Sequence, residues 1–210
     1  MIFIKKRKNT PAVFREAKNS YEDYEELSTA LKRQMKAFLI REQGGLCAYC
    51  MSRIALDTAT IEHYLPQSKA PDKTLDYRNL LAVCNNGRNE RGKVRHCDVT
   101  RGNRELHIDP CREEDIKHIS YKRNGIILGD IEEIDRDLNV ILNLNNPTLK
   151  NNRKAALNTA FDVLKRRNKG MWTKEYLEQC LESLREQKEK TPYVGIIMYE
   201  LEKRLSRDTY

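Results

Sequence analysis

Four of the six cysteines lie in one stretch of the chain, where their spacing suits a metal ion. Cys47 and Cys50 form a Cys-x-x-Cys pair, which can present two thiolates to one metal from a tight turn. Cys84 and Cys97 could supply a second pair, although twelve residues separate them where a second such turn would have two. Because zinc takes four ligands in a tetrahedron and four thiolates are a common set, the spacing predicts a structural zinc site.

The ligand set has alternatives. His96 or Cys111 could replace one of the four thiolates, and four buried free thiols would be a site without metal. Cys180 lies within an apolar helical stripe and is interpreted as a small buried residue. We do not expect disulfides, because the chain has the features of a cytosolic protein.

Glu62 and His63 are adjacent in the segment IEHYLPQS, residues 61–68, of a chain with only four histidines. A neutral histidine can accept a proton from water near neutral pH, so His63 suits a general base. The neighbouring carboxylate of Glu62 can bind a hard divalent cation. Neighbouring residues of a strand point to opposite sides, so a site that uses both predicts a bend here. Pro66 gives this bend modest support.

Further polar residues follow along the chain. Asn79 precedes an apolar, strand-like run and could hydrogen-bond loop backbone groups that fix the spacing of a site. Asp98 directly follows Cys97, so a zinc-bound Cys97 would hold it in place as a second ligand of the divalent cation. Three basic residues could bind phosphates: Lys93, Arg101 and Arg104. Each residue taken singly also fits a turn, a strand edge or a solvated face; their order among the cysteines favours a site.

The composition is that of a charge-rich chain of 210 residues, with room for one domain or one domain plus an extension. The hydrophobic fraction of 39% argues against disorder. No apolar run approaches the roughly 20 residues of a membrane span, and the start of the sequence lacks the apolar core of a signal peptide. We therefore expect a cytoplasmic protein. The net charge of +8 suits a polyanionic partner such as nucleic acid.

The apolar pattern predicts helices at both ends of the chain. A helix is predicted over 21–43, with Ser20 as its N-cap and Gly44 and Gly45 as its stop. Residues 46–110 are irregular and poor in apolar side chains, so a metal is expected to hold them. Residues 118–130 predict a β-hairpin with a two-residue Asn124-Gly125 turn. Three helices are predicted after residue 131, the second with Thr173 as its N-cap and the third over 193–205.

The sequence resembles the HNH endonucleases, whose ββα-metal core carries an acid–His pair, a middle Asn and a final His, Asn or Asp. Glu62 and His63 match the pair, Asn79 matches the middle residue, and Asp98 stands at the final position, where His or Asn is more common. The four cysteines match the zinc ligands that often brace this core, with an insertion, NNGRNERGKVRH, inside the second pair. The final metal-facing residue could therefore be Asp98, His96 or both.

The resemblance extends over roughly residues 1–165 to the HNH subunit of Septu-type anti-phage defence systems, some of which are retron-associated. It rests on the stretches REQGGLCAYC, IEHYLPQS, DYRNLLAVCNNG, HCDVTRGN, ISYKRNGII and ILNLNNPTLKNNR. It implies a bacterial cytoplasmic protein that acts with an ABC-like ATPase. The expected partner is nucleic acid, with DNA favoured over RNA and both left open by the sequence.

Together these observations predict an α+β, mainly helical fold. Its parts would be a zinc-braced HNH core with an N-terminal helix, a β-hairpin and a C-terminal helical part. Residues 1–130 would form the nuclease domain around a core at 47–103, and residues 131–210 a helical subdomain that could bind a partner. The expected reaction is phosphodiester hydrolysis, with His63 as the base and Mg²⁺ or Mn²⁺ on Glu62 and Asp98. The alternative is a zinc-stabilised nucleic-acid-binding or adaptor subunit without activity.

Overall fold

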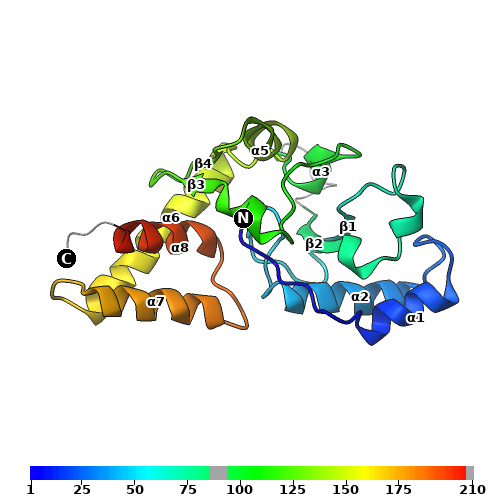
Figure 1. Cartoon of the computed structure of the whole chain (residues 1–210), viewed down its shortest axis with the longest axis horizontal. Helices are drawn as coiled ribbons and strands as arrows, with labels where there is room; N and C mark the ends of the chain where they lie inside the picture. Colours follow the sequence, from blue (N-terminus) through cyan, green and yellow to red (C-terminus); the bar gives the residue numbers. More distant parts are fainter. Residues whose placement is uncertain (86–93, 207–210) are drawn as a thin grey trace.

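The computed structural model describes residues 1–85 and 94–206. Over these residues the fold is α+β, as predicted, with two small antiparallel sheets among the helices. Figure 1 shows α1, α2 and the first sheet at one end of the molecule and α6, α7 and α8 at the other, with the second sheet and α5 between them. Within the described residues, no helix is both long enough and apolar enough to cross a membrane.

The N-terminal part contains two helices, α1 (Ala12–Ser20) and α2 (Thr29–Glu42), where the sequence predicts one over 21–43. The N-cap of α2 is Ser28, whose side chain accepts a hydrogen bond from the Leu31 backbone N–H. The prediction began the helix too early because the apolar spacing continues through the turn that precedes it. The end of the helix was predicted correctly, since α2 stops just before the two glycines at 44 and 45, both with positive φ.

The first sheet pairs β1 (Ala59–His63) with β2 (Leu80–Cys84) in antiparallel register. Every residue of β2 is buried, so this strand is the centre of its part of the core. The connection between the strands contains two short 3-10 turns, η1 (Pro71–Lys73) and η2 (Tyr77–Asn79). The next described helix is α3 (Asp98–Arg101), which is only four residues long. The order β1, β2, α3 places two strands and a helix around the predicted site.

The predicted hairpin is present, formed by β3 (Ile119–Tyr121) and β4 (Ile127–Gly129) after the short helix α4 (Glu113–Lys117). Its loop has three residues rather than two. Gly125 donates its N–H to the Lys122 carbonyl at 2.8 Å, and Lys122 donates to the Ile126 carbonyl at 2.9 Å. Gly125 has φ +89, so it takes the left-handed position of a three-residue hairpin loop.

The C-terminal part is helical, as predicted. Its elements are α5 (Glu132–Arg136), the π-helical turn η3 (Asp137–Ile141), α6 (Pro147–Arg167), α7 (Lys174–Glu186) and α8 (Val194–Leu205). Thr173 caps α7 as predicted, because its side chain accepts a hydrogen bond from the Tyr176 N–H. The apolar stripes of α6 and α7 contribute buried side chains to the core: Leu157, Phe161, Leu177 and Leu181.

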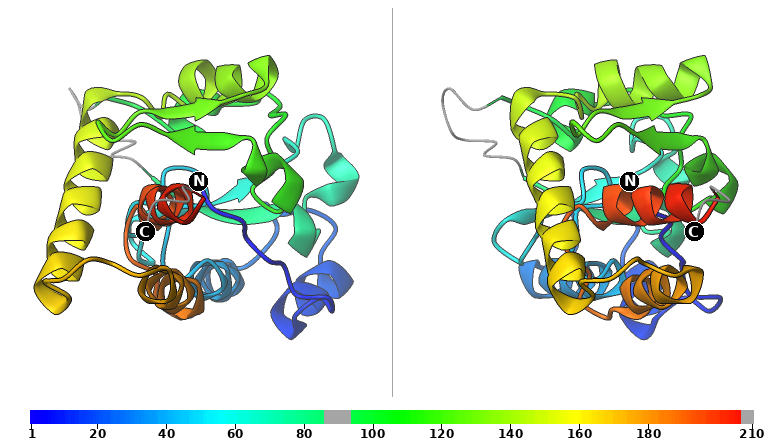
Figure 2. Two further views of the ribbon diagram at one scale, coloured as in Figure 1. Left: turned by 60° about the vertical axis from the view of Figure 1, so that its left-hand side comes forward. Right: turned by 90° about the vertical axis from the view of Figure 1, so that its left-hand side faces the viewer.

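Backbone hydrogen bonds join the two parts of the chain across residue 130. Tyr193 donates to the Met51 carbonyl at 3.0 Å, and Cys97 donates to the Leu142 carbonyl at 2.9 Å. The N-terminal segment lies beside α8 (Figure 2), where the Met1 carbonyl is so close to Gly195 that a side chain at this position would clash with it. The division at residue 130 stays a prediction, and one cluster of buried apolar side chains includes residues from both sides of it.

Candidate metal centre and carboxylate pair

The four predicted zinc cysteines come together in the structure. The Sγ atoms of Cys47, Cys50, Cys84 and Cys97 all lie within 4.8 Å of one another, and all four side chains are buried. The Cys47–Cys97 pair is 3.9 Å apart and the Cys50–Cys84 pair 3.8 Å. A tetrahedral zinc ion with bonds of about 2.3 Å separates its sulfur ligands by about 3.8 Å. The four thiols therefore fit a zinc ion, and the chain keeps them free of disulfides.

The first two cysteines lie in a tight turn. Cys47 donates its N–H to the Ser52 carbonyl at 2.9 Å, and Met51 donates to the Cys47 carbonyl at 3.0 Å. Met51 has φ +63, a left-handed conformation that closes the turn. This geometry directs both thiols toward one point, as the Cys-x-x-Cys spacing predicts.

The second pair comes from two separate elements, so its wide spacing in the sequence does not prevent the cluster. Cys84 ends β2, and Cys97 precedes α3. Cys97 has φ +55 and ψ −138, a backbone conformation that costs a residue with a side chain on the order of 1–3 kcal/mol. A metal bond at its thiol is a physical reason for the chain to keep it there.

The other cysteines and His96 lie outside the group of four. His96 places Nδ1 3.1 Å from the Cys97 sulfur and 3.9 Å from the Cys84 sulfur, so it contacts the thiol cluster. Cys111 is not among the clustered thiols, and Cys180 packs against the core from α7. Burial raises the pKa of the Cys97 thiol. The pKa of Cys50 is lowered, chiefly because its thiol forms a hydrogen bond with Cys47.

Glu62 lies buried on β1 beside a second acidic residue. Its Oε1 accepts hydrogen bonds from the Tyr49 hydroxyl at 3.1 Å and from Nη1 of Arg101. Burial raises the pKa of Glu62 to about 7; Arg101 opposes this rise, and Asp98 adds to it through its charge and a hydrogen bond. The two carboxyl groups predicted to share a cation are therefore neighbours.

This pair of carboxyl groups has the chemistry of a site for a hard divalent cation. Mg²⁺ and Mn²⁺ prefer carboxylate oxygens, and Mg²⁺ is commonly held by one or two carboxylates. Burial is the main cause of the raised pKa of Glu62; the charge of Asp98 adds to it, and the Arg101 guanidinium is the counter-charge that opposes it. The two carboxyl groups are thus of the chemical type that binds such a cation, although Arg101 already bonds to one oxygen of Glu62.

His63 has a different set of neighbours from Glu62. Its Nε2 lies 2.9 Å from the Thr74 carbonyl oxygen, and its ring meets the Tyr24 ring edge-on at 4.9 Å between centroids. Nε2 also lies 3.2 Å from Nε2 of Gln67. A carbonyl only accepts, so in the tautomer that bonds to Thr74 the proton is on Nε2 and Nδ1 is the proton acceptor. Burial lowers the pKa of His63, which keeps the ring neutral near pH 7.

The predicted bend between Glu62 and His63 is absent. Both residues belong to β1 and remain in register with β2, opposite Leu81 and Leu80. The alternation of the strand therefore persists to His63, and the two side chains have separate hydrogen-bond partners. Pro66 lies beyond the end of the strand, where it cannot bend it.

Asn79 braces the loop that follows β1, as the sequence predicts. Its side-chain oxygen accepts from the Leu65 N–H at 2.7 Å, and its amide donates to the carbonyls of Leu65 and Lys73, both at 3.1 Å. Asn79 is buried, so these bonds satisfy its polar atoms within the protein. They fix the loop between the two strands. This loop contains Thr74, whose carbonyl is the hydrogen-bond partner of His63.

Arg101 has a different role from the predicted phosphate contact. Its side chain is 1% exposed, and it donates to Glu62, to the Tyr49 hydroxyl at 3.2 Å, and to three backbone carbonyls. A guanidinium group with all its nitrogens engaged inside the protein is not available to a phosphate. Arg104 is exposed, but its guanidinium also donates to backbone carbonyls. Lys93 lies outside the described residues.

Tyr49 is the site residue that the sequence analysis did not identify. It is fully buried between the two cysteines of the turn, and its hydroxyl reaches Glu62. An aromatic residue at such a position usually fills a core, so only its place between two metal ligands distinguished it. Tyr49 joins the thiol cluster to the carboxylate pair.

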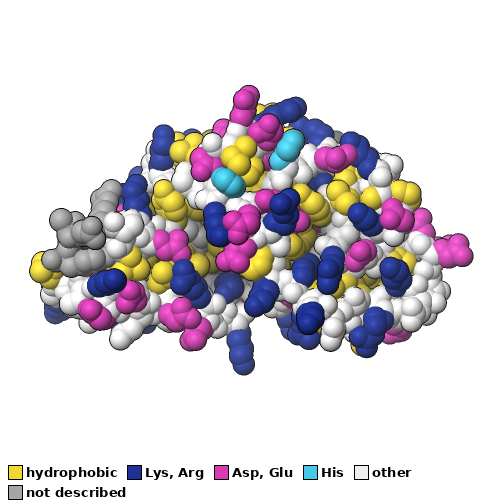
Figure 3. Space-filling model, in the orientation of Figure 1, with side chains coloured by type: hydrophobic (Ala, Val, Ile, Leu, Met, Phe, Trp, Pro, Cys, Tyr) yellow, Lys and Arg dark blue, Asp and Glu magenta, His cyan; other side chains and the backbone are white. Residues whose placement is uncertain are grey.

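Basic side chains are not confined to this site; Figure 3 shows Lys and Arg spread over the whole visible face, with acidic side chains among them.

Comparison with known proteins adds no identification. No model of a known protein family matches the sequence, and a search of curated proteins finds no match.

Proposed function

We propose that this chain is a metal-dependent endonuclease of the HNH type, which hydrolyses phosphodiester bonds of nucleic acid, DNA in preference to RNA. The observation that supports it best is the placement of Glu62 beside Asp98, next to a cluster of four thiols. The two carboxyls come from β1 and α3, which frame β2 in the order expected of an HNH core. A structural zinc and a separate catalytic cation would account for both groups.

Each residue of the site would have its own role in this reaction. Glu62 and Asp98 would hold Mg²⁺ or Mn²⁺, which would supply positive charge for the phosphoryl oxygens and the leaving oxygen. His63 would take a proton from the attacking water at Nδ1, since Nε2 is bound to the Thr74 carbonyl. Asn79 would hold the loop beside it. The four-thiolate zinc would leave no open position, so its role would be structural.

We also propose that the protein acts as the effector subunit of an anti-phage defence complex with an ABC-like ATPase. This part rests on the resemblance to Septu-type HNH subunits alone. The ATPase would control when the nuclease acts, and the bacterial cytoplasm would be the place of action.

Cleavage assays test the proposal. Plasmid DNA, single-stranded DNA and RNA are incubated with the protein and Mg²⁺ or Mn²⁺, alone and with the candidate ATPase. We expect cation-dependent cleavage that His63→Ala reduces on the order of 10²- to 10⁴-fold. His107→Ala is the matched control, because that histidine is exposed and outside the site. Equal cleavage by wild type and the folded His63→Ala variant would remove His63 from the mechanism.

A second candidate is a zinc-stabilised nucleic-acid-binding or adaptor subunit without activity. The observation that favours it is the ion pair of Glu62 with Arg101, which a purely structural network would also contain. Normal nucleic acid binding without cleavage under any of these conditions would favour this candidate.

A further inference from the structure

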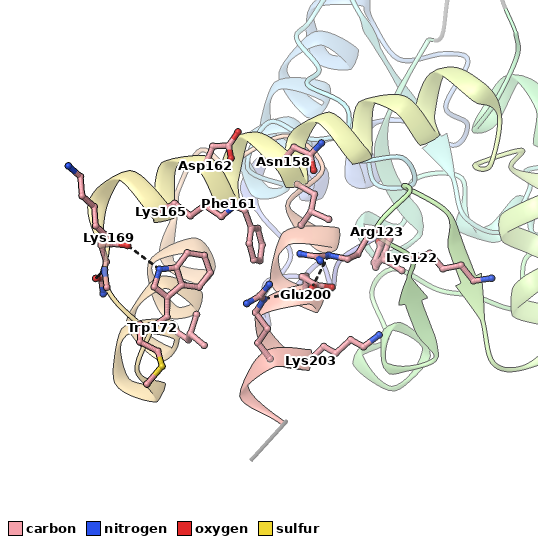
Figure 4. A pocket seen from close by; sticks show the side chains of 17 residues that line it. Lys122, Arg123, Asn158, Phe161, Asp162, Lys165, Lys169, Trp172, Glu200 and Lys203 are labelled. Atoms are coloured by element: carbon pink, nitrogen blue, oxygen red, sulfur yellow. Dashed lines mark hydrogen bonds and ion pairs between the residues drawn. The ribbon is translucent and has the colours of Figure 1, made fainter. Parts of the chain in front are cut away.

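A groove at the end of the molecule opposite β1 and β2 has features of a binding site. It has a volume of about 1360 Å³ and lies between the β3–β4 loop, α6, the α6–α7 connection and α8. Small-molecule pockets measure about 300–1,000 Å³, so this groove is large enough for a segment of a polymer. Figure 4 shows its lining, with Phe161 and Trp172 between Lys169 on one side and Lys203 on the other.

The groove is strongly basic. Its lining contains two acidic residues, Asp162 and Glu200, against six basic ones: Lys122, Arg123, Lys165, Lys169, Lys203 and Arg204. The whole chain has 39 basic and 31 acidic residues, so the ratio of basic to acidic residues is higher in the groove than in the chain as a whole. Glu200 is already paired with Arg123 at 3.2 Å and with Arg204 at 3.7 Å, which removes much of the negative charge.

Several of these lysines are available to a ligand. Lys122, Lys165 and Lys169 are exposed, and none forms an ion pair with a residue of the described part of the chain. Lys165 and Lys169 lie at one side of the groove, on α6 and just beyond it, and Lys122 lies at the other side, beside the hairpin loop (Figure 4). This arrangement suits a ligand with several negative charges along its length.

The floor of the groove is aromatic. Trp172 is half-buried and packs on Phe161 with ring centroids 5.6 Å apart, while the Arg204 guanidinium lies 5.4 Å from the Trp172 ring. The indole N–H donates to the Asn168 carbonyl at 3.2 Å, which fixes the ring. Proteins that bind single strands stack unpaired bases on such aromatic rings, while neighbouring basic side chains contact the phosphates.

We propose that this groove binds single-stranded nucleic acid. Stacking on Trp172 requires a base free of its complement, which favours a single strand over a duplex. The choice of nucleic acid over another polyanion rests in part on the proposed nuclease function. The groove lies apart from Glu62 and Asp98, so it would bind a part of the strand that the nuclease site does not contact.

Trp172 also provides the test, because it is the only tryptophan in the chain. The zinc-loaded protein, without Mg²⁺ or Mn²⁺ so that no cleavage occurs, is titrated with a 12-residue oligothymidylate while tryptophan fluorescence is recorded. The same titration uses thymidine monophosphate, which carries base and phosphate without a chain, and heparin, which carries charge without bases. Lys165→Gln/Lys169→Gln is compared with Lys188→Gln, an exposed lysine outside the groove.

We expect the oligonucleotide to quench the fluorescence at concentrations where the mononucleotide and heparin do not. The double variant should bind more weakly and lower the slope of log K against log salt by about 1.4, since each lost single-strand contact removes about 0.7. Lys188→Gln should behave as wild type. Binding by anisotropy without quenching, equal quenching by heparin, or an unchanged double variant would each overturn the proposal. None of these readings depends on cleavage, so an inactive protein that still shows quenching would refute only the nuclease.

Discussion

Arg101→Met removes the cation that faces Glu62 and should destabilise the protein strongly. The Arg101 side chain is 1% exposed and supplies the positive partner of a buried carboxylate. Breaking a buried ion pair by removing one partner costs about 3–5 kcal/mol, because the other charge stays buried without compensation. Two carbonyls of residues 63 and 64 also lose their donor. We expect a loss of unfolding free energy of at least about 3 kcal/mol near pH 8.

The pH dependence of this loss follows from the pKa of Glu62. In the folded protein this pKa is raised to about 7 from 4.5, so the folded state binds more protons than the unfolded one and its stability falls as pH rises toward 7. Arg101 lowers this pKa, so its removal should raise it further. The difference between variant and wild type should therefore widen above pH 7, by up to about 1.4 kcal/mol per pH unit.

Urea unfolding followed by circular dichroism, at pH 6 and pH 8 with zinc present, measures this difference. Arg41→Met is the matched control, since that arginine is exposed and should change stability by about 0.5 kcal/mol or less. A loss below about 1 kcal/mol for Arg101→Met would refute the buried network. Full stability together with weakened nucleic acid binding would instead support the phosphate contact first predicted for this residue.

Three further predictions concern the metal sites and the loop. The purified protein should contain about one zinc ion per chain by elemental analysis. Cys84→Ala should lose the ion and unfold at a lower temperature. An unchanged midpoint of thermal unfolding would argue for free thiols. Mn²⁺ affinity, measured by calorimetry, should fall about tenfold per pH unit below about pH 7, because the proton on Glu62 competes with the cation; a flat profile there would exclude Glu62 as a ligand. Asn79→Ala should lower the free energy of unfolding, measured in urea, by about 1–3 kcal/mol because three backbone groups lose their partner. An unchanged value would mean that the loop is stable without this side chain.

The thiol cluster could be predicted from the sequence because metal ligands are few and their chemistry is specific. The spacing of Cys47 and Cys50 predicts a tight turn, and Cys84 and Cys97 complete the four ligands that a tetrahedral zinc site requires. Asn79 was also predictable in kind, since a polar residue before a buried strand tends to bond nearby backbone. The helices after residue 131 followed from their apolar period.

Other features depended on contacts between distant residues. Arg101 belongs to a charged stretch that resembles a solvated face, and only the approach of β1 and α3 buries it against Glu62. The start of α2 was misplaced because Tyr24 and Leu27 continue the apolar spacing through the turn before it. The relation of Glu62 to His63 depended on how far the strand extends, which the sequence does not mark.

The hydrogen bond from Tyr193 to Met51 has a consequence for how the protein is made. The turn that carries the first two cysteines is synthesised early. The Met51 carbonyl, however, has no backbone donor until Tyr193 has been synthesised. Cys97 likewise bonds to Leu142, which is translated later. Domains that fold during synthesis complete their N-terminal parts first. Here the thiol turn becomes fully bonded only after residue 193 has been synthesised, so a chain that stalls or is cut short before that residue would carry an incompletely supported thiol cluster.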